Sequence, residues 1–170
     1  DIQEEGTELV LRNLLTGALY RHQLVTDYHF NKYGQVLVLE CSGKKGDGRI
    51  VPVITWRSLQ TGKVDTVMKN FHDAKGFAIT ESGSQLAFVA ERDSTARSLR
   101  RYYKAWRYQP GMDSAVMIAG PSLSVTDHSY IIQPGFNNYF SKDGSRLFIG
   151  LSPDQPVKDT NLVDFETAKL

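Results

Sequence analysis

Histidine is the side chain best suited to acid–base chemistry near neutral pH, because its imidazole titrates there. The chain contains His22, His29, His72 and His128. Asp27 stands two residues before His29 and could pair with it. Asp127 directly precedes His128, but adjacent residues on a strand point to opposite faces, so these two make a poor catalytic pair. We expect all of the histidines to be solvated or to lie at the edge of the core.

Other sequence patterns for catalysis and metal binding are missing. A serine hydrolase of the α/β type places its nucleophile in a Gly-x-Ser-x-Gly turn, and no such pentapeptide occurs. No histidines have the i,i+4 spacing of a zinc protease, and there is no Cys-x-x-Cys. Asp154 and Asp159 are too far apart for a calcium loop and a proline lies between them. We therefore expect no catalytic, metal-binding or cofactor-binding residues in this chain.

The segment "DSTARSLRRYYKAWRYQPG", residues 93–111, combines basic and aromatic side chains, which can bind single-stranded nucleic acid. Its periodicity is ambiguous between a helix and a strand. Helical spacing is present in Leu99, Tyr102, Tyr103 and Trp106, with Arg97, Arg100, Arg101 and Lys104 on the other side; strand alternation is present in Tyr102, Lys104, Trp106 and Tyr108. The aromatic density and the Pro-Gly stop favour a strand from about Tyr102. We expect an ordinary sheet surface rather than a nucleic-acid face.

Length and charge restrict the class of protein. The 170 residues suffice for one domain with a hydrophobic core. Twenty basic and nineteen acidic residues give a net charge of +1, which argues against a nucleic-acid or membrane-surface partner. No apolar run approaches the roughly 18 residues of a membrane span, and the N-terminus "DIQEEGTELV" does not resemble a signal peptide. Cys41 is the single cysteine, so no internal disulfide is possible, and we expect a buried, inert thiol.

A phrase with a central glycine occurs three times, as "FNKYGQVLVLE" from Phe30, "ITESGSQLAFVA" from Ile79 and "FSKDGSRLFIG" from Phe140. The glycines are Gly34, Gly83 and Gly144. In each copy an apolar residue stands four positions before the glycine and a leucine three positions after it, followed by an apolar segment. A short hairpin loop usually needs a residue at positive φ, and glycine adopts this conformation without a Cβ penalty. The phrase predicts a hairpin at each place.

A second phrase marks another set of turns. "NLLTGALY" contains Thr16-Gly17, "SLQTGKVD" contains Thr61-Gly62, and "DFETAKL" is a degenerate copy with Thr167-Ala168. The first two Thr-Gly copies are 45 residues apart, and the hairpin glycines are 49 and then 61 residues apart, so the last interval must contain an insertion. A period in the forties fits the blade of a β-propeller, where a four-stranded sheet takes about 40–45 residues.

We therefore predict an all-β fold, a partial β-propeller of about three to four blades built from four-stranded antiparallel sheets, with residues 1–170 forming a single segment. The expected strands are 9–13, 20–24, 27–30, 36–41, 50–58, 64–69, 76–79, 86–90, 102–108, 115–119, 138–140, 147–150 and 162–165. The glycine-rich stretch "ECSGKKGDGRIVPV" lacks the spacing of a phosphate loop and is expected to be a long hairpin loop.

The phrases "FSKDGSRLFIGLSP", "GSQLAFVAERD", "NLLTG" and "SLQTGK" resemble the propeller repeats of the prolyl oligopeptidase family, most closely its large exported bacterial members. TolB-type propellers share the short hairpin motif. In the resembled family a β-propeller caps an α/β-hydrolase domain that carries a Ser-Asp-His triad. No catalytic domain is present in this chain, so no catalytic residue is carried over. The chain is also too short for a complete propeller, so we expect a fragment of a larger one.

The resemblance implies a non-catalytic role, in which the propeller covers the active site of a parent serine peptidase and restricts entry to short peptides. The implied partners are an α/β-hydrolase domain in the parent chain and the parent's peptide substrate, and the implied location is periplasmic or secreted. The alternative is a stand-alone propeller that binds a protein or glycan. An open propeller also leaves apolar faces on its terminal blades, so we expect self-association. The residues expected to be exposed there are Leu9, Leu11, Leu162, Val163 and Phe165.

Overall fold

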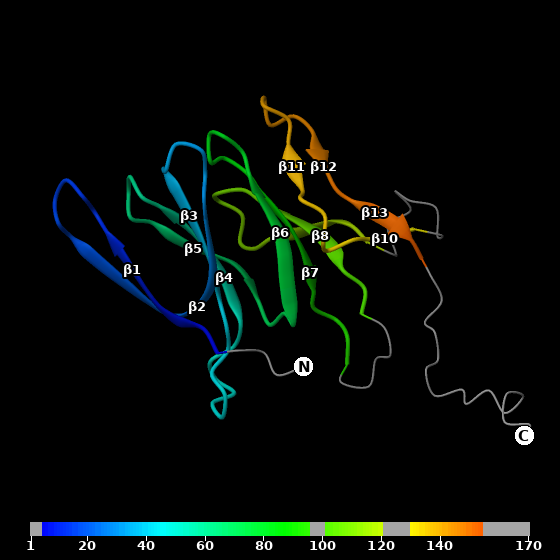
Figure 1. The fold of residues 1–170 in the computed structure, drawn as a ribbon, viewed down its shortest axis with the longest axis horizontal. Coiled ribbons are helices and arrows are strands. Elements are labelled where there is room, and N and C mark those ends of the chain that lie inside the picture. The colour runs from blue at the N-terminus through cyan, green and yellow to red at the C-terminus, as the bar shows by residue number, and fades with distance from the viewer. Residues whose placement is uncertain (1–4, 96–100, 121–129, 155–170) are drawn as a thin grey trace, which may run out of the picture.

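The computed structural model describes residues 5–95, 101–120 and 130–154, and all regular structure in these ranges is β-strand (Figure 1). The strands are β1 (Thr7–Arg12), β2 (Leu19–Phe30), β3 (Val36–Cys41), β4 (Val53–Ser58), β5 (Val64–Lys69), β6 (Asp73–Ile79), β7 (Leu86–Glu91), β8 (Lys104–Tyr108), β9 (Val116–Ala119), β10 (Tyr130–Ile132), β11 (Tyr139–Phe140), β12 (Leu147–Phe148) and β13 (Leu151–Pro153). No helix able to cross a membrane is found in these ranges.

The strands form two complete four-stranded units and a hairpin at each end. β2 is shared: its first half pairs with β1, and its second half pairs with β3. The first blade is thus the second half of β2 with β3, β4 and β5, and the second blade is β6, β7, β8 and β9. We call β1 with the first half of β2 the N-terminal hairpin. The C-terminal hairpin pairs β10 with β13 and β11 with β12.

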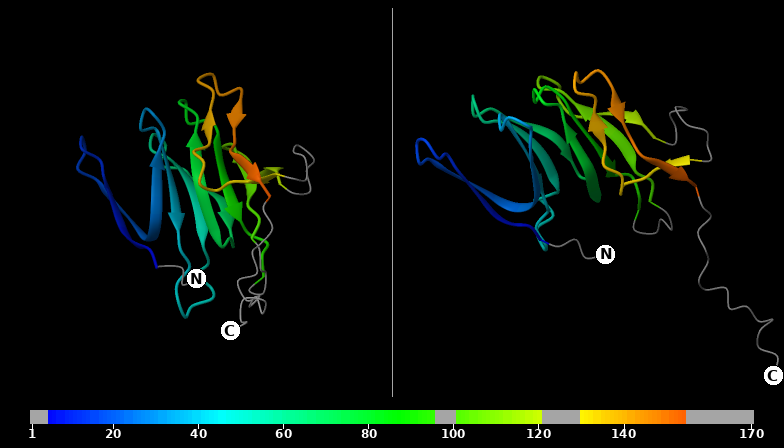
Figure 2. Two further views of the ribbon diagram at one scale, coloured as in Figure 1. Left: turned by 45° about the vertical axis from the view of Figure 1, so that its right-hand side comes forward. Right: turned by 45° about the horizontal axis from the view of Figure 1, so that its top comes forward.

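These units follow one another in chain order across the molecule (Figures 1 and 2), and the all-β partial propeller predicted from the sequence is confirmed. The Thr-Gly turns join β1 to β2 and β4 to β5, so they mark the third and fourth strands of a blade. The hairpin glycines lie between the first and second strands. The two phrases recur out of step because each belongs to a different hairpin of the blade.

The predicted strands differ from the observed ones in a few places. Strands expected at 20–24 and 27–30 form the single strand β2, which bends at Leu24, a non-glycine residue with φ of 60°. β10 and β13 were not predicted. Each has only three residues, and they pair with one another outside the β11–β12 pair of the C-terminal hairpin. The segment at 104–108 is a strand, which resolves the helix–strand ambiguity. The expected strand at 162–165 lies outside the described residues.

The core is divided into layers between the units, because both faces of the central strands are buried. Successive side chains of a strand point to opposite faces. On β3, Val36 and Val38 pack toward the second blade, whereas Leu37 and Leu39 pack toward β1. On β7, Leu86 and Phe88 face the first blade, and Val89 faces the C-terminal hairpin. Full burial of one such side chain contributes roughly 1.5–3 kcal/mol, so the blades stabilise one another.

The three hairpin turns have the same geometry. Gly34, Gly83 and Gly144 have φ of 64°, 72° and 71°, and each donates its N–H to the carbonyl three residues earlier, as expected from the repeat. The residue at that earlier position also uses its side-chain oxygen to accept the N–H five residues later. These pairs are Asn31 Oδ1 with Val36 at 2.9 Å, Thr80 Oγ1 with Gln85 at 3.0 Å and Ser141 Oγ with Arg146 at 2.9 Å.

The turns also bind one another from blade to blade. Asn31 Nδ2 donates to the carbonyl of Glu81 at 2.9 Å, and Lys32 Nζ lies 2.7 Å from the Glu81 carboxylate. In the same way Gln85 Nε2 donates to the carbonyl of Gly144 at 3.0 Å. All three tips lie on the same side of the molecule (Figure 1). The hydrogen bonds therefore fix the relative position of consecutive units at this end.

The expectation of exposed apolar residues at the ends needs correction. Leu9 and Leu11 pack inward against β3. The outward face of the N-terminal hairpin carries an ion pair of Arg21 with Glu8 at 2.6 Å, beside the exposed Val10. Inward packing follows from strand alternation, since the face toward the first blade is the apolar one. Leu162, Val163 and Phe165 lie outside the described residues. The C-terminal hairpin does expose aromatic side chains, including Phe136, Tyr139 and Phe148.

We predict that the cost of replacing a turn glycine depends on the neighbouring blade. At Gly34 an added Cβ meets no atom within 4 Å, so Gly34→Ala should cost about 1 kcal/mol through positive-φ strain alone. At Gly83 the added Cβ would lie 2.6 Å from Val36 Cγ2, so Gly83→Ala should cost about 2–3 kcal/mol. Urea unfolding of both variants measures the difference, and equal losses would mean that the turns do not interlock.

Candidate functional site

The first strands of consecutive units, β2, β6 and β11, contact one another along one edge of the sheets. The His29 ring on β2 stacks on Phe77 of β6 with centroids 4.6 Å apart. Asn138, which directly precedes β11, donates from Nδ2 to the carbonyl of Gly76 on β6 at 2.9 Å. We define the inner surface by the side chains of these strands and of the end of β3. They are Asp27, His29, Glu40, Asp73, Lys75 and Phe77.

Asp27 and His29 form the pair that their spacing allowed, but the pair is a weak one. His29 Nε2 lies 3.3 Å from Asp27 Oδ2, yet this nitrogen is buried and makes no well-directed hydrogen bond. Burial lowers the pKa of His29, and the nearby Asp27 carboxylate only partly offsets that effect. The imidazole is therefore neutral near pH 7 and packs on Phe77 as a core-edge ring, as the sequence suggested.

The other histidines differ in their surroundings. His22 lies on the N-terminal hairpin, and its pKa is lowered first by burial and second by the charge of Arg57. The exposed His72 has its Nε2 3.0 Å from the carbonyl oxygen of Ser94. His128 and Asp127 lie outside the described residues. The fold thus places these imidazoles in separate regions, and they form no shared site within the described part of the chain.

Three carboxylates that the sequence analysis did not single out gather near one end of the inner surface. Burial raises the pKa of Glu40 to about 7, with smaller contributions from the negative charges of Asp73 and Asp27. Asp73 accepts a hydrogen bond from the Tyr103 hydroxyl and lies 2.9 Å from Lys75 Nζ. Glu40 and Asp73 line a cavity of about 360 Å³. The carboxylates of Glu40 and Asp73 can accept hydrogen bonds from a ligand in this cavity, and Glu40 can hold or release a proton near neutral pH.

Glu91 is the third of these carboxylates and is almost completely buried, with 1% of its surface exposed. It pairs with Asp73 across β6 and β7. Its Oε1 accepts the backbone N–H of Ser94 at 2.8 Å, and its Oε2 has no hydrogen-bond partner. In the sequence, Glu40 and Glu91 can be recognised because each follows an apolar run near the end of its strand, in "VLVLEC" and "LAFVAE". Across the described ranges, no group of such side chains is arranged to hold a metal ion.

The basic and aromatic segment is built into the second blade. The Tyr108 hydroxyl donates to Asp65 at 2.9 Å, and Arg107 Nε donates to Gln85 at 2.9 Å. Lys104 pairs with Asp93, and Tyr103 bonds to Asp73. Alternate side chains of β8 thus go to opposite faces of a covered sheet. Arg97 and Arg100 lie outside the described residues. As expected from the sequence, residues 104–108 form an ordinary strand of the sheet.

The glycine-rich stretch forms the expected loop between β3 and β4. It is closed by a bridge between Lys44 and Asp47, and the carboxylate of Asp47 lies 3.0 Å from Arg49 Nε. Cys41 is half-buried rather than fully buried, and burial raises the pKa of its thiol. A raised pKa leaves the thiol protonated and unreactive near pH 7, in agreement with the inert role expected for it.

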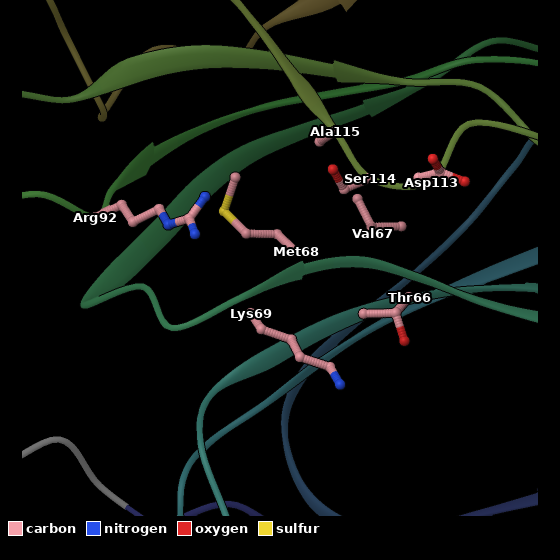
Figure 3. Close-up of a pocket in the computed structure, with 8 residues that line it drawn as sticks. All are labelled: Thr66, Val67, Met68, Lys69, Arg92, Asp113, Ser114 and Ala115. Atoms are coloured by element: carbon pink, nitrogen blue, oxygen red, sulfur yellow. The ribbon is translucent and has the colours of Figure 1, made fainter.

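A separate cleft of about 370 Å³ lies between β5 and the segment that leads into β9. Figure 3 shows Arg92 beside Met68 at one end and Asp113 with Ser114 at the other. The two segments are joined by the N–H of Ala115, which donates to the carbonyl of Val67 at 2.8 Å. The cleft thus lies where the first and second blades meet. Arg92 is at one end of it and Asp113 is at the other (Figure 3).

Comparison with known proteins identifies the fold. No protein-family model and no curated protein matches the sequence. Among solved structures, prolyl endopeptidases give a TM-score of 0.56 at 13% identity, over 86% of this chain and 23% of theirs. The β-propeller domain of the Trilobed protease from Pyrococcus furiosus gives 0.50 at 14% identity, over 74% and 39%. TolB from Acinetobacter baumannii gives 0.50 at 18% identity, over 86% and 32%.

These similarities show a β-propeller fold, and the resemblance inferred from the sequence phrases is confirmed at that level. The neighbours include propeller portions of peptidases, and the described part of this chain contains no α/β-hydrolase fold. The chain spans less than two fifths of the length of each of these three structures. Identities below 25% carry information on the fold and none on activity.

We predict that Glu40→Gln stabilises the protein at alkaline pH. The folded pKa of Glu40 is about 7, above its ordinary value of 4.5, so its favourable contribution is complete below about pH 4.5 and is lost as the pH rises through 7. The neutral amide avoids this loss. The variant should exceed the wild type by about 2 kcal/mol at pH 8 and match it at pH 4. Denaturant unfolding at the two pH values measures the effect.

Glu81→Gln is the matched control with the opposite sign. The hydrogen bond from Lys32 lowers the pKa of Glu81, so its contribution is present above the ordinary pKa and is lost as the pH falls. This variant should be less stable than the wild type at pH 8, with the difference vanishing in acid. If Glu40→Gln behaved like this control or like the wild type at pH 8, the raised pKa of Glu40 would be wrong.

Proposed function

We propose that this chain is the non-catalytic propeller portion of a larger, prolyl oligopeptidase-like serine peptidase. In this role it caps the active site of an α/β-hydrolase domain and restricts entry to short peptides. The observation that carries the proposal is that the first strands of consecutive blades contact one another at one inner surface. The fold similarity to prolyl endopeptidases supports it. Residues 1–170 would be one segment of the parent propeller, and the parent would be periplasmic or secreted.

The inner surface supports contact with a peptide. Its side chains offer acceptors at Asp27 and Asp73 and a cation at Lys75. The Phe77 ring stacks on His29 and Phe88 and supports this surface from the core. A peptide presents backbone N–H and C=O groups and side chains of mixed polarity, which match such a set. The hydrogen-bonded turns hold the blades in fixed positions, and a fixed opening is what exclusion of larger substrates requires.

The alternative is a stand-alone propeller that binds a protein or glycan, and the similarity to TolB, which covers as much of this chain as that to prolyl endopeptidases, supports it as the second candidate. The reading frame of the gene beyond Leu170 separates the two functions. The peptidase proposal requires a Gly-x-Ser-x-Gly turn within several hundred residues, and a stop codon soon after residue 170 would favour the binding module.

The full-length protein encoded by the gene tests the capping role directly. Gly83→Val should loosen the stacked turns, because its side chain would collide with Val36 of the first blade. We expect cleavage of a long peptide to rise relative to cleavage of a short chromogenic prolyl substrate. Gly34→Val is the control, since its turn has open space around it. An unchanged ratio in Gly83→Val would contradict the capping role.

We predict that the purified 170-residue chain hydrolyses nothing. It lacks the Gly-x-Ser-x-Gly turn, and the described strands supply no hydrolase domain. Chromogenic prolyl and alanyl dipeptide substrates should show background rates, and a serine-reactive phosphonate should leave the intact mass unchanged. Stoichiometric labelling of a serine would show instead that the chain carries its own nucleophile.

We also predict that the isolated chain forms dimers through its ends. The N-terminal hairpin corresponds to the third and fourth strands of a blade and the C-terminal hairpin to the first and second, so each end of one copy can complete a blade of another. Tyr139 and Phe148 are exposed on the C-terminal hairpin and stack with centroids 4.7 Å apart. Exposed apolar surface and open strand edges both favour association.

Light scattering over a concentration series tests this prediction. Tyr139→Asp combined with Phe148→Asp should shift the equilibrium toward the monomer by tenfold or more in the dissociation constant, which corresponds to about 1.4 kcal/mol. Ile50→Asp, at an exposed apolar position of the β3–β4 loop, is the control and should not change it. A wild-type chain that stays monomeric at high concentration would rule out the association.

A further inference from the structure

A cavity of about 530 Å³ lies between the N-terminal hairpin and the first blade, beside the turns of both. The end of β1, the start of β2 and the end of β4 contribute to its walls. Its lining includes Arg12 and Arg57 and contains no aspartate or glutamate. Leu11 and Leu59 provide apolar surface, and both belong to the layer that packs against Leu37 and Leu39. The cavity is therefore cationic on an apolar base.

Arg57 is the central feature of this cavity. It lies on β4 opposite Leu37, on the face that is turned toward the N-terminal hairpin. Its guanidinium carbon is 4.7 Å from the centroid of the Tyr20 ring. The side chain is half-buried, and within the described residues it has neither an ion pair nor a hydrogen bond. Its nitrogens are not among the buried atoms that lack a partner, so the N–H donors face the open cavity, where a ligand with an acceptor can reach them.

Two neutral polar side chains of the cavity lining, Asn13 and Gln35, present donors, because the turns already use their oxygens. Asn13 Oδ1 accepts the N–H groups of Leu15 and Thr16 at 2.9 and 3.0 Å, which leaves its Nδ2 as a donor. Gln35 Oε1 is 3.4 Å from Asn31 Nδ2, which leaves the Gln35 Nε2 as a donor. The local turn chemistry thus creates a lining that matches an acceptor-rich ligand.

His22 supplies a further observation next to this cavity. Its Nε2 is buried and has no hydrogen-bond partner. His22 stands two residues after Tyr20 on β2, so both side chains are on the same face of the strand; burial lowers the pKa of His22, and the charge of Arg57 lowers it further. His22 thus has a buried nitrogen without a hydrogen-bond partner, and Arg57 has a cation–π contact with Tyr20 but no anion. Arg57 lines the cavity and can donate to an acceptor in it, whereas His22 lies outside the lining.

We propose that this cavity binds an organic carboxylate that carries an apolar body. The guanidinium of Arg57 holds the carboxylate through charge-assisted hydrogen bonds, which are stronger than neutral ones and can be bidentate. Arg12 adds positive charge at the rim, and the apolar body of the ligand packs on Leu11 and Leu59. The C-terminus of a peptide with an apolar last residue has this chemistry, and so does a free small carboxylate. The proposal does not depend on the peptidase role.

Titration of the 170-residue chain with a matched pair of probes tests the site. N-acetyl-L-leucine carries the carboxylate and the apolar body, and N-acetyl-L-leucine amide has the same body without the charge. Two-dimensional NMR should show shifts confined to residues 11–13, 20, 34–35 and 57–62. The acid should bind at least tenfold more tightly than the amide, with a dissociation constant of about 1 mM or below. An unblocked peptide ending in leucine then distinguishes a peptide terminus from a free acid, and binding of either one supports the proposal.

Substitutions at Arg57 show whether its guanidinium is responsible. Arg57→Met keeps a long side chain against Tyr20 and should weaken binding of N-acetyl-L-leucine at least tenfold. Arg57→Lys keeps the charge but not the planar fork, and should have an intermediate affinity. Arg49→Met makes the same replacement at an exposed loop arginine and should leave binding unchanged. The backbone NMR spectrum of each variant verifies that the fold is retained.

Several results would overturn the proposal. Equal affinity for the acid and the amide would exclude recognition of the carboxylate. Acetate or inorganic phosphate binding as tightly as N-acetyl-L-leucine would exclude a role for the apolar body. Unchanged binding in both Arg57→Met and Arg57→Lys would assign the ligand to another part of the surface. The absence of any shift in residues 57–62 up to about 20 mM acid would show that the cavity does not bind this class of ligand.

Discussion

Burial of β3 and β7 on both faces is the constraint on which the rest of the structure depends. Every residue of β7 is buried, and so are the first four of β3. A strand with two apolar faces cannot be stable in a single sheet, because one face would remain in water. Each blade therefore needs a neighbour on either side. Because of this requirement the units pack against one another in chain order.

The stacked turns convert this apolar packing into a defined geometry. Hydrophobic contact is non-directional and would allow neighbouring sheets to slide. The hydrogen bonds from Asn31 to Glu81 and from Gln85 to Gly144 are directional, and they link the turns in sequence. Glycine is needed at these turns for its positive φ, and at Gly83 also because Val36 of the neighbouring blade leaves no room for a Cβ. The repeated turn residues therefore have two functions: they form the turn, and they contact the neighbouring blade.

The electrostatic features of the molecule arise where units meet. Glu40 titrates near neutral pH because the second blade covers it and brings Asp73 close. Arg57 lies without an anion because the N-terminal hairpin covers the face of β4 that carries it. In both cases a polar side chain at the end of an apolar strand is partly removed from water by a neighbouring unit. Candidate sites for ligands are thus located at the margins of the layers, where burial is incomplete.

The sequence by itself determined the all-β class, the hairpin turns and the blade period, because strand alternation and positive-φ glycines are local requirements that can be read residue by residue. It also indicated that β8 is a strand and that Asp27 could reach His29. Only the tertiary structure decided which face of each strand meets which neighbour. That choice turned Leu9 and Leu11 inward, joined two expected strands into β2, and brought Glu40 near Asp73 and Arg57 onto Tyr20. Such contacts join residues far apart in the chain, and their energies depend on burial that no local pattern specifies.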